Sequence, residues 1–413
     1  MKRSRLAMSY SVAMLSVHTS PLDNPGRTKD AGGMNVYMLA LAYALAQHNL
    51  TIDIFTRWTN ERIPQIVQLH PAVRVIHIKA GPLASVHKHD LYEHLPTFVH
   101  HIEEFRRREA GAYDVIHSHY WLSGVAAMQL AQRWDVPHVT MFHTLAYLKM
   151  LANPHQAEPA LRLEMERQLI EHTDRIIAST ADERTQILHY SGVPAKRVAV
   201  IPCGVDTDLF VHHERPLARE RLGLHPQRPI LLFAGRLDAF KGPDLFLRAA
   251  AMMQKDAQIV IVGGKLGDDP TIQELQHLAH QLAIADRVYF LGARPLQEMP
   301  WVYSAAHVTV VPSYHETFGL TAVESLACAT PVVATRAGGL TTVVQHGKTG
   351  FLVPRSASFF AKHLDMLLQN DLLYARLSKA ARPSVLSYCW QRIAHQVYGV
   401  YDELISDMSC LVV

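Results

Sequence analysis

Short apolar runs rich in β-branched residues alternate along the chain with longer stretches whose apolar residues have helical spacing. Runs such as "YSVAMLSV", "TIDIFTR" and "DVIHSH" predict buried strands, whereas "NVYMLALAYALAQH" and "RLEMERQLIEH" predict helices. Strands that alternate with helices are typical of a mainly parallel, doubly wound sheet. The pattern therefore predicts an α/β protein.

The alternation restarts after the stretch "CGVDTDLF". There "PILLFAGR", "AQIVIVGG", "HVTVVPS" and "PVVATR" predict a second set of strands. We therefore expect two doubly wound domains, residues 1–202 and 203–387, with a linker at residues 202–212. Because such sheets bind ligands beyond the carboxyl ends of their strands, two of them predict a ligand cleft between the domains.

Composition is consistent with two soluble domains. The chain has 413 residues, which exceeds what one hydrophobic core usually supports, and its net charge of +3 gives no basis for a nucleic-acid surface. The four cysteines form no C-x-x-C pair, and no H-E-x-x-H occurs among the 26 histidines. We therefore expect free thiols in the cytoplasm, and no zinc site. No run of about 18 apolar residues is present, so we expect no transmembrane segment.

Both ends of the chain carry short motif-like stretches. The start, "MKRSRLAMSYSVAMLSV", resembles a signal peptide, but its apolar run is short and leads into a polar loop, which favours a first buried strand. The final "CLVV" matches a prenylation box, although four-residue matches arise readily by chance. Before it, "SVLSYCWQRIAHQVYGVYDEL" has helical apolar spacing and predicts an amphipathic helix.

A glycine pair, Gly32 and Gly33, ends the long polar loop after the first predicted strand and precedes a predicted helix. Glycines at such a position let backbone amides approach an anion closely, although a plain tight turn explains them equally well. The motif G-x-G-x-x-G is absent, which disfavours a dinucleotide-dependent dehydrogenase.

Two cations follow the strand "PILLFAGR", namely Arg236 and, five residues on, Lys241. A planar guanidinium and a flexible ammonium at this spacing can bind two linked phosphates. A solvated loop with two cations is the alternative interpretation of the same residues.

The stretch "HETFGLTAVES" places Glu316 just before a predicted helix and Glu324 inside it. Amides at the helix start, around Phe318, Gly319 and Leu320, favour phosphate oxygens. A carboxylate accepts hydrogen bonds and suits vicinal hydroxyls, and a separation of eight residues is about 2.2 helical turns, which would put both carboxylates on one side. The stretch therefore predicts a phosphate held between two sugars, unless Glu316 only stabilises the helix dipole and Glu324 is solvated.

Lys88 lies in the irregular stretch "GPLASVHKHD", where a cation can reach an anion. This placement is compatible with a phosphorylated second substrate, and equally with a surface lysine in a charged cluster.

Taken together, these motifs resemble the retaining glycosyltransferases of family 4, which have the GT-B fold of two Rossmann-like domains. The resemblance covers nearly the whole chain, through "GGMNVY", "FHTL", "AGRLDAFKG", "GARP", "PSYHETFGLTAVE" and "HGKTGFLV". The stretches "SVHTSP", "DAGGMNVY" and "HSHYWLSG" narrow it to the group that contains inositol-phosphate glycosyltransferases and sucrose-phosphate synthases.

The resemblance implies roles for the donor residues, with a UDP-sugar as donor. Arg236 and Lys241 would bind its diphosphate, Glu324 its ribose hydroxyls and Glu316 the hydroxyls of the transferred sugar. Further donor contacts are implied for Gly32, Gly33, Arg294 beside the uracil, His143 beside the sugar, and the amides near Phe318, Gly319 and Leu320.

On the acceptor side, the resemblance implies a small phosphorylated polyol such as inositol phosphate. The matching positions are Asn35, Lys88, Tyr120, Thr144 and Arg162. His117 and His119 also follow a predicted strand, and either or both can be structural histidines.

The resemblance further implies that the sugar is transferred with retention, without a covalent enzyme intermediate and without an obligate metal, a divalent cation being at most stimulatory. It implies that the terminal helix, residues 388–413, joins the N-terminal domain, and it is compatible with a homodimer. Three other functions share most of these motifs: sucrose-phosphate synthase-like transfer to a sugar phosphate, sugar-nucleotide epimerisation, and nucleotide-sugar binding without catalysis.

Overall fold

The computed structural model describes residues 9–23, 32–155, 157–267 and 269–411. The signal-peptide-like start up to residue 8 and the last two residues of "CLVV" lie outside this range. The chain divides into two compact units. Unit 1 comprises the residues up to Asp23, Met34–Pro202 and the residues from Trp390 onward; unit 2 comprises Cys203–Cys389 and a short segment that ends at Gly33.

Unit 1 contains an eight-stranded sheet in the order β3-β4-β2-β1-β5-β6-β7-β8, in which β3 pairs antiparallel to β4 and all other pairs are parallel. The predicted first strand is confirmed, while β3 was not expected from the sequence because its side chains are largely exposed. The strands are β1 Ser11–Ser16, β2 Thr51–Arg57, β3 Ile66–His70, β4 Val73–Ile78, β5 Val115–His119, β6 His138–Met141, β7 Arg175–Ala178 and β8 Val198–Val200.

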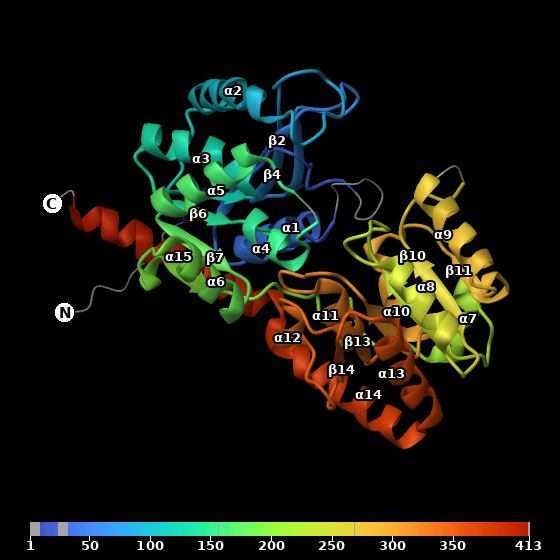
Figure 1. Cartoon of the computed structure of the whole chain (residues 1–413). Helices are drawn as coiled ribbons and strands as arrows, with labels where there is room; N and C mark the ends of the chain where they lie inside the picture. Colours follow the sequence, from blue (N-terminus) through green and yellow to red (C-terminus); the bar gives the residue numbers. More distant parts are fainter. Residues whose placement is uncertain (1–8, 24–31, 156, 268, 412–413) are drawn as a thin grey trace, which may run out of the picture. The chain divides into compact units, whose positions relative to one another are not determined.

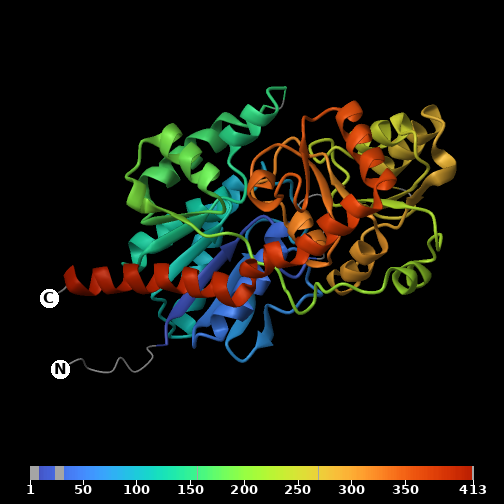
Figure 2. The same cartoon turned by 90° about the horizontal axis from the view of Figure 1, so that it is seen from below.

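The helices of unit 1 form two packing groups. Helices α2, α3, α5 and α6 pack in succession on one another, whereas α1 contacts α15 through the ring pair Tyr37–Trp390, and His48, two residues after α1, stacks on Tyr398. The long α15 crosses the strands of this unit (Figure 2). The helices are α1 Gly33–Ala46, α2 Leu95–Arg108, α3 Trp121–Trp134, α4 Ala146–Ala152, α5 Ala160–His172, α6 Ala181–Ser191 and α15 Trp390–Leu411.

Helix α15 begins after the 3₁₀ turn Leu386–Tyr388 and is bound to the sheet of unit 1 by polar contacts. Tyr10 Oη donates to Asp402 Oδ1 at 2.8 Å, and Tyr401 Oη lies 2.6 Å from His117 Nδ1. Residues from both ends of the chain therefore complete one unit.

Unit 2 contains a six-stranded, all-parallel sheet in the order β11-β10-β9-β12-β13-β14 (Figure 1). Its inner strands are buried along their whole length, which explains why they appear in the sequence as continuous apolar runs. The strands are β9 Ile230–Ala234, β10 Gln258–Val262, β11 Val288–Phe290, β12 Val308–Val311, β13 Val332–Thr335 and β14 Gly350–Val353.

The helices of unit 2 also fall into two groups. Helix α8 packs against α9 and α13, while α10 packs against α7 and α11, and α11 against α14. This arrangement confirms the predicted doubly wound architecture. The helices are α7 Arg215–Leu222, α8 Pro243–Met252, α9 Pro270–Gln281, α10 Met299–Ala305, α11 Leu320–Ala327, α12 Leu340–Val343, α13 Ala357–Gln369 and α14 Asp371–Val385.

In each sheet the strand order reverses at one point, which lies between β1 and β5 in unit 1 and between β9 and β12 in unit 2. On either side of this point, successive strands are added toward opposite edges of the sheet. At such a point the loops that follow the two strands separate to opposite faces, which leaves a crevice at the carboxyl ends where ligands bind. Among the described residues, no helix is long and apolar enough to cross a membrane.

Close backbone packing beside this point in unit 2 requires glycine at position 263. Gly263 has φ +143°, and a Cβ there would lie 1.9 Å from the carbonyl oxygen of Gly235, the residue after β9. We predict that Gly263→Ala lowers the stability by about 1–3 kcal/mol through backbone strain alone, and by more through the clash. Thermal unfolding followed by circular dichroism measures this loss.

The matched control is Gly399→Ala, because Gly399 lies within α15 and a Cβ there would meet no other part of the fold within 4 Å. There alanine should raise the stability by about 0.5–1 kcal/mol. Equal unfolding midpoints for the two variants would contradict the close approach at Gly263.

Candidate active site

Most of the predicted donor residues of unit 2 follow β9 or β12, the two strands at the switch in strand order. Arg236 and Lys241 follow β9, while Glu316 and Gly319 follow β12. The two loops are joined by the backbone hydrogen bond from Tyr314 N to Phe240 O, of 2.9 Å. The fold therefore brings together two motifs that lie 75 residues apart in the sequence.

Lys241 and Glu316 form an ion pair at this point. Lys241 Nζ lies 2.8 Å from both Oε1 and Oε2 of Glu316, and Ser313 Oγ donates to Oε1 at 2.7 Å. Their side chains are only 23% and 14% exposed. Burial raises the pKa of Glu316, but the charge of Lys241 and the hydrogen bonds outweigh it and hold the pKa below its ordinary value. Glu316 is therefore a carboxylate at neutral pH.

Arg236 lies beside this pair on the loop that follows β9. Its Nε is 3.3 Å from Asp238 Oδ2, and about a third of its side chain is exposed. Asp238 also accepts the backbone N–H of Lys241, at 3.2 Å from Oδ1. One aspartate thus orients both cations that the sequence predicted to bind phosphate.

The start of α11 is held close to Glu316 by a glycine turn. Gly319 has φ +100° and precedes the helix, and Gly339 N donates to Glu316 O at 2.7 Å. A Cβ at Gly339 would lie 2.4 Å from the Cα of the buried Phe318. The first amides of a helix lack partners within it, so this tightly packed start can bind an anion. Gly339 and Ser313 were not among the residues predicted from the sequence.

Glu324 lies on α11 and has a different environment from Glu316. Tyr303 Oη, from α10, donates to Glu324 Oε2 at 2.7 Å. Burial raises the pKa of Glu324 to about 7 even though this hydrogen bond lowers it. The expected helical relation between the two glutamates is wrong, because Glu316 lies in an irregular segment and only the residues from Leu320 onward are helical.

Arg294 lies in the "GARP" loop that follows β11, the strand at the edge of the sheet. Arg294 Nε donates to Leu291 O at 3.1 Å, and its Nη1 lies 3.3 Å from Glu298 Oε2. Two strands separate β12 from β11, so Arg294 lies further along the strand ends than the pair Lys241–Glu316. This order is compatible with a ligand that extends across the ends of several strands.

The predicted acceptor residues belong to unit 1, and several are held by contacts within it. Asn35 is buried and donates from Nδ2 to Thr19 Oγ1 at 3.0 Å and to Ser20 O at 2.5 Å. Asn35 therefore fixes the loop that follows β1.

Arg162, Tyr120 and Thr144 meet in one cluster. Arg162 Nη2 donates to Thr144 O at 2.6 Å, and its guanidinium carbon lies 4.9 Å from the centre of the Tyr120 ring. Arg162 is 2% exposed and is paired with Glu158 at 2.8 Å and with Glu166 at 2.7 Å. Two carboxylates already balance this cation, so the structure assigns it to holding the loop after β6, and its contact with an acceptor phosphate stays a prediction.

Lys88 lies half-buried in the irregular loop before the 3₁₀ turn Tyr92–His94. The neighbouring His89 has a pKa lowered by burial and by the charges of His87, Lys88 and Arg162. Arg162 thus acts on the residue next to Lys88, and the contact of Lys88 with an acceptor phosphate stays a prediction.

His143 follows β6 with φ +58° and belongs to a cluster of buried histidines. His119 Nδ1 lies 2.9 Å from His143 Nε2, and His117 Nδ1 is bonded to Tyr401 Oη. Burial lowers the pKa of His143 to about 3, so its imidazole is neutral and can only offer hydrogen bonds to a sugar. His117 thus contacts α15 and His119 contacts His143, and whether either histidine is purely structural stays a prediction.

Gly32 and Gly33 stand at the beginning of α1, whose first residue is Gly33. Residues 24–31 of the preceding loop, which include Asp30 and Ala31 of "DAGG", lie outside the described residues. The predicted close approach of these glycines to a donor phosphate stays a prediction.

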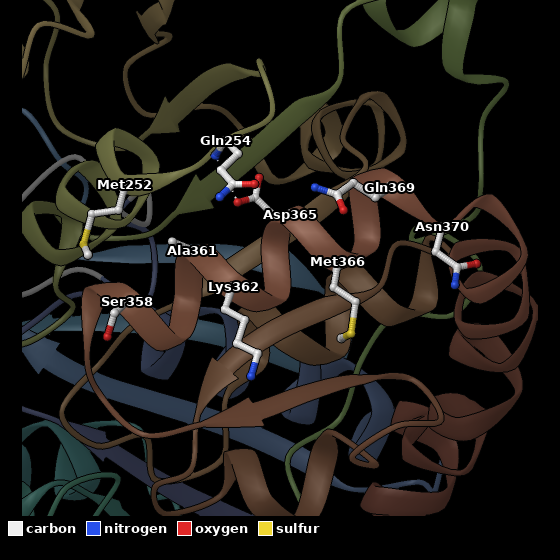
Figure 3. Close-up of a pocket in the computed structure, with 9 residues that line it drawn as sticks. All are labelled: Met252, Gln254, Ser358, Ala361, Lys362, Asp365, Met366, Gln369 and Asn370. Atoms are coloured by element: carbon white, nitrogen blue, oxygen red, sulfur yellow. Dashed lines mark hydrogen bonds between the residues drawn. The ribbon is translucent and has the colours of Figure 1, made fainter.

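A separate depression of about 570 Å³ lies on unit 2, between α13 and the end of α8 (Figure 3). None of the predicted site residues lines it, and its carboxylate, Asp365, already accepts the backbone N–H groups of Gln254 and Lys255. It offers no chemistry comparable to that of the strand ends.

Among the described residues, a single group has the spacing of a metal site: His100, His101 and Glu104, on the exposed side of α2. It lies on a helix surface and not at the ends of the strands. The prediction of transfer without an obligate metal therefore stays a prediction.

Two doubly wound units, each with a switch in strand order, are the architecture of the GT-B class of glycosyltransferases. The family model "Glycosyltransferase Family 4" matches residues 31–209, and "Glycosyl transferases group 1" matches residues 214–384. The chain therefore belongs to glycosyltransferase family 4 and is a glycosyltransferase, which sets aside nucleotide-sugar binding without catalysis.

Relatives match the chain over nearly its full length. It is 42% identical over 402 residues to the D-inositol 3-phosphate glycosyltransferase of Xylanimonas cellulosilytica, covering 95% of this chain and 96% of that one. It is also 42% identical to the enzyme of that name from Streptomyces scabiei, covering 96% and 92%. The sucrose-phosphate synthase from Thermosynechococcus elongatus is 32% identical with a TM-score of 0.90, covering 96% and 100%.

The raised pKa of Glu324 should make the stability of unit 2 depend on pH. Between pH 4.5 and about 7 the folded state keeps a proton that the unfolded state has released, so stability falls as the pH rises through this window. Glu324→Gln removes this titration. Relative to the unchanged protein, the variant should gain stability between pH 5 and pH 8, by about 1.4 kcal/mol per unit of pKa shift.

Thermal unfolding midpoints at both pH values measure this difference, and Glu274→Gln on the exposed side of α9 is the control. A Glu324→Gln difference that is the same at pH 5 and pH 8 would show that Glu324 is not protonated at neutral pH.

Proposed function

We propose that this glycosyltransferase moves a hexose or N-acetylhexosamine from a UDP-sugar, with retention of configuration, to a small phosphorylated polyol such as inositol phosphate. The observation that carries the donor half is the partly buried ion pair of Lys241 and Glu316, with Arg236 and the start of α11 on the adjoining loops. This arrangement provides cations and backbone amides that can bind a diphosphate. It also provides a carboxylate that can bind sugar hydroxyls.

In this proposal Arg236, Lys241 and the amides near Gly319 bind the diphosphate. Glu324 accepts hydrogen bonds from the ribose hydroxyls, and Glu316 from the hydroxyls of the transferred sugar. Arg294 lies beside the uracil. Each acid is suited to its role, because a carboxylate is an acceptor that can bind two adjacent hydroxyls.

The chemical step follows from where charge develops. The bond between the anomeric carbon and the β-phosphate oxygen breaks, so negative charge grows on UDP, where Lys241, Arg236 and the helix amides stabilise it. The acceptor hydroxyl bonds to the anomeric carbon on the face that UDP leaves, and its proton passes to the departing phosphate oxygen. Glu316 is held by Lys241 and Ser313 and positions the sugar, so no glutamate acts as a nucleophile.

The relatives support the acceptor half of the proposal. The curated proteins at about 40% identity are named D-inositol 3-phosphate glycosyltransferases. In unit 1, the half-buried Lys88 would supply a cation for the acceptor phosphate, because two carboxylates already balance the charge of Arg162. Transfer to a sugar phosphate is the second candidate, because the sucrose-phosphate synthase matches the whole chain.

Three further expectations belong to this proposal and remain to be tested. The reaction needs no obligate metal, the protein acts in the cytoplasm, and it can form a homodimer. Epimerisation of the nucleotide sugar without an acceptor would leave a changed sugar nucleotide when the donor alone is incubated with the protein.

Lys241→Met removes one preorganised cation from the diphosphate, and we predict that kcat falls by about 10²- to 10³-fold. Glu316→Gln should lower the rate as well, because it weakens the hydrogen bonds from the hydroxyls of the transferred sugar. Transfer of labelled sugar to inositol phosphate measures both effects, and far-UV circular dichroism verifies folding.

The matched control is Lys362→Met on α13, in the depression of Figure 3, which should keep the full rate. Full activity of both Lys241→Met and Glu316→Gln would remove the proposed donor site.

Lys88→Met tests the acceptor phosphate. A hydrogen bond to a charged group is worth about 1.5–3 kcal/mol, so KM for inositol phosphate should rise about 10- to 100-fold while KM for the UDP-sugar is unchanged. Assays of UDP- and GDP-sugars against inositol phosphate, fructose phosphate and unphosphorylated inositol identify the substrates. Lys196→Met, at an exposed position of unit 1, is the control.

If unphosphorylated inositol served as well as inositol phosphate, Lys88 would have no role in binding phosphate. If fructose phosphate were the better acceptor, the second candidate would replace the first.

A further inference from the structure

Tyr303 is a buried residue whose hydroxyl contacts the proposed ribose-binding carboxylate. It lies on α10, which packs against α11, and is 1% exposed. Tyr303 Oη donates to Glu324 Oε2 at 2.7 Å. No motif in the sequence singles out this tyrosine, and none of the predicted roles includes it.

The position of the Tyr303 ring is fixed from several sides. Its backbone carbonyl accepts Thr330 Oγ1 at 2.8 Å, and its ring lies 6.1 Å from that of Phe210. The next residue, Ser304, accepts the backbone N–H of His213 at 3.0 Å. The phenol therefore has little freedom to follow a moving carboxylate, so the carboxylate must adopt the orientation that the phenol sets.

Where Glu324 is ionised, above about pH 7, the direction of the hydrogen bond is also fixed. Burial and the charge of Glu324 raise the pKa of Tyr303 well above its ordinary value, so the phenol keeps its proton and donates it. Among the described residues, the contact of the Glu324 carboxylate with a side chain is made through Oε2. Oε1 is then the oxygen that remains to accept a hydrogen bond from a ligand.

We infer that Tyr303 is a positioning residue for the nucleotide: its hydroxyl fixes Glu324 Oε2, so that the carboxylate meets the ribose hydroxyls in one orientation. The inference rests on the proposed function, because it requires that Glu324 contacts the ribose. Tyr303 itself touches no substrate. It sets the preference for a ribose over a sugar that lacks these hydroxyls.

A positioning role of Tyr303 should also affect how UDP binding depends on pH, which a purely structural tyrosine would not do. The hydrogen bond from Tyr303 lowers the pKa of Glu324, against the rise that burial causes, so its loss should raise this pKa further. Cys328, at the end of α11, also interacts with Glu324, and Arg382 on α14 acts on Cys328 and donates to Ala327 O at 2.7 Å. The substitution of Tyr303 leaves both in place.

The test compares two ligands that share the diphosphate and the uracil: UDP and 2′,3′-dideoxyuridine diphosphate. Calorimetry with the unchanged protein should show tighter binding of UDP. In Tyr303→Phe we expect UDP to bind about tenfold more weakly, for the loss of one hydrogen bond to a charged group, with the dideoxy ligand unchanged. The pH at which UDP binding weakens on acidification should move upward.

Two further variants distinguish a role of Tyr303 in positioning Glu324 from a general loss of structure in unit 2. Tyr374→Phe also removes a phenol hydroxyl from unit 2, one bonded to Arg215, and should leave both affinities unchanged. Adding Tyr303→Phe to Glu324→Gln should weaken UDP binding no further than Glu324→Gln alone. Should Tyr303→Phe fail to fold, 3-fluorotyrosine at position 303, a stronger donor of the same shape, should instead tighten UDP binding selectively.

The outcomes are distinct. If Tyr303→Phe keeps the ratio of affinities for UDP and its dideoxy analogue, the positioning role is wrong. If it weakens both ligands equally, Tyr303 supports the fold and not the ribose. If the unchanged protein binds both ligands equally, Glu324 does not contact the ribose and that part of the proposed function fails instead.

Discussion

The pair of Lys241 and Glu316 is the interaction on which the proposed donor site depends. Removing two charges from water is costly, and their attraction balances that cost only when the geometry is good and further hydrogen bonds are made. Here Ser313 supplies one such bond, and the glycine turn at Gly339 holds the backbone of Glu316. The sheet sets the position of the pair. Strands β9 and β12 are adjacent in the sheet although they are far apart in the sequence, so the loops that follow them lie next to each other.

Much of the fold was predictable because buried parallel strands leave a direct trace in the sequence. Runs such as "AQIVIVGG" are apolar throughout since both faces of the sheet are covered, and β10 is buried at every position. Strand β3 left no such trace, because the side chains of Ile66–His70 are exposed or half-buried. The pairing order of the strands, which creates the site, is set by long-range packing that no local pattern contains.

The site was predictable where local motifs carry the chemistry and not where burial does. Arg236, Lys241 and Glu316 stand in short loops next to recognisable strands, so their convergence could be anticipated. The helical relation expected for Glu316 and Glu324 was wrong, because the turn that ends at Gly319 separates them. Tyr303 and the two carboxylates around Arg162 could not be found from the sequence, since their importance comes from which side chains meet inside the fold.

The contribution of α15 to unit 1 has a consequence for synthesis on the ribosome. The contacts Tyr10–Asp402 and His117–Tyr401 join residues 392 and 284 positions apart, so this unit stays incomplete until Tyr401 and Asp402 have been translated. Residues 203–389 form a continuous stretch that emerges earlier. Unit 1, whose strands are synthesised first, is therefore the unit whose fold is completed last. Until α15 has been synthesised, the sheet of unit 1 is not covered by this helix.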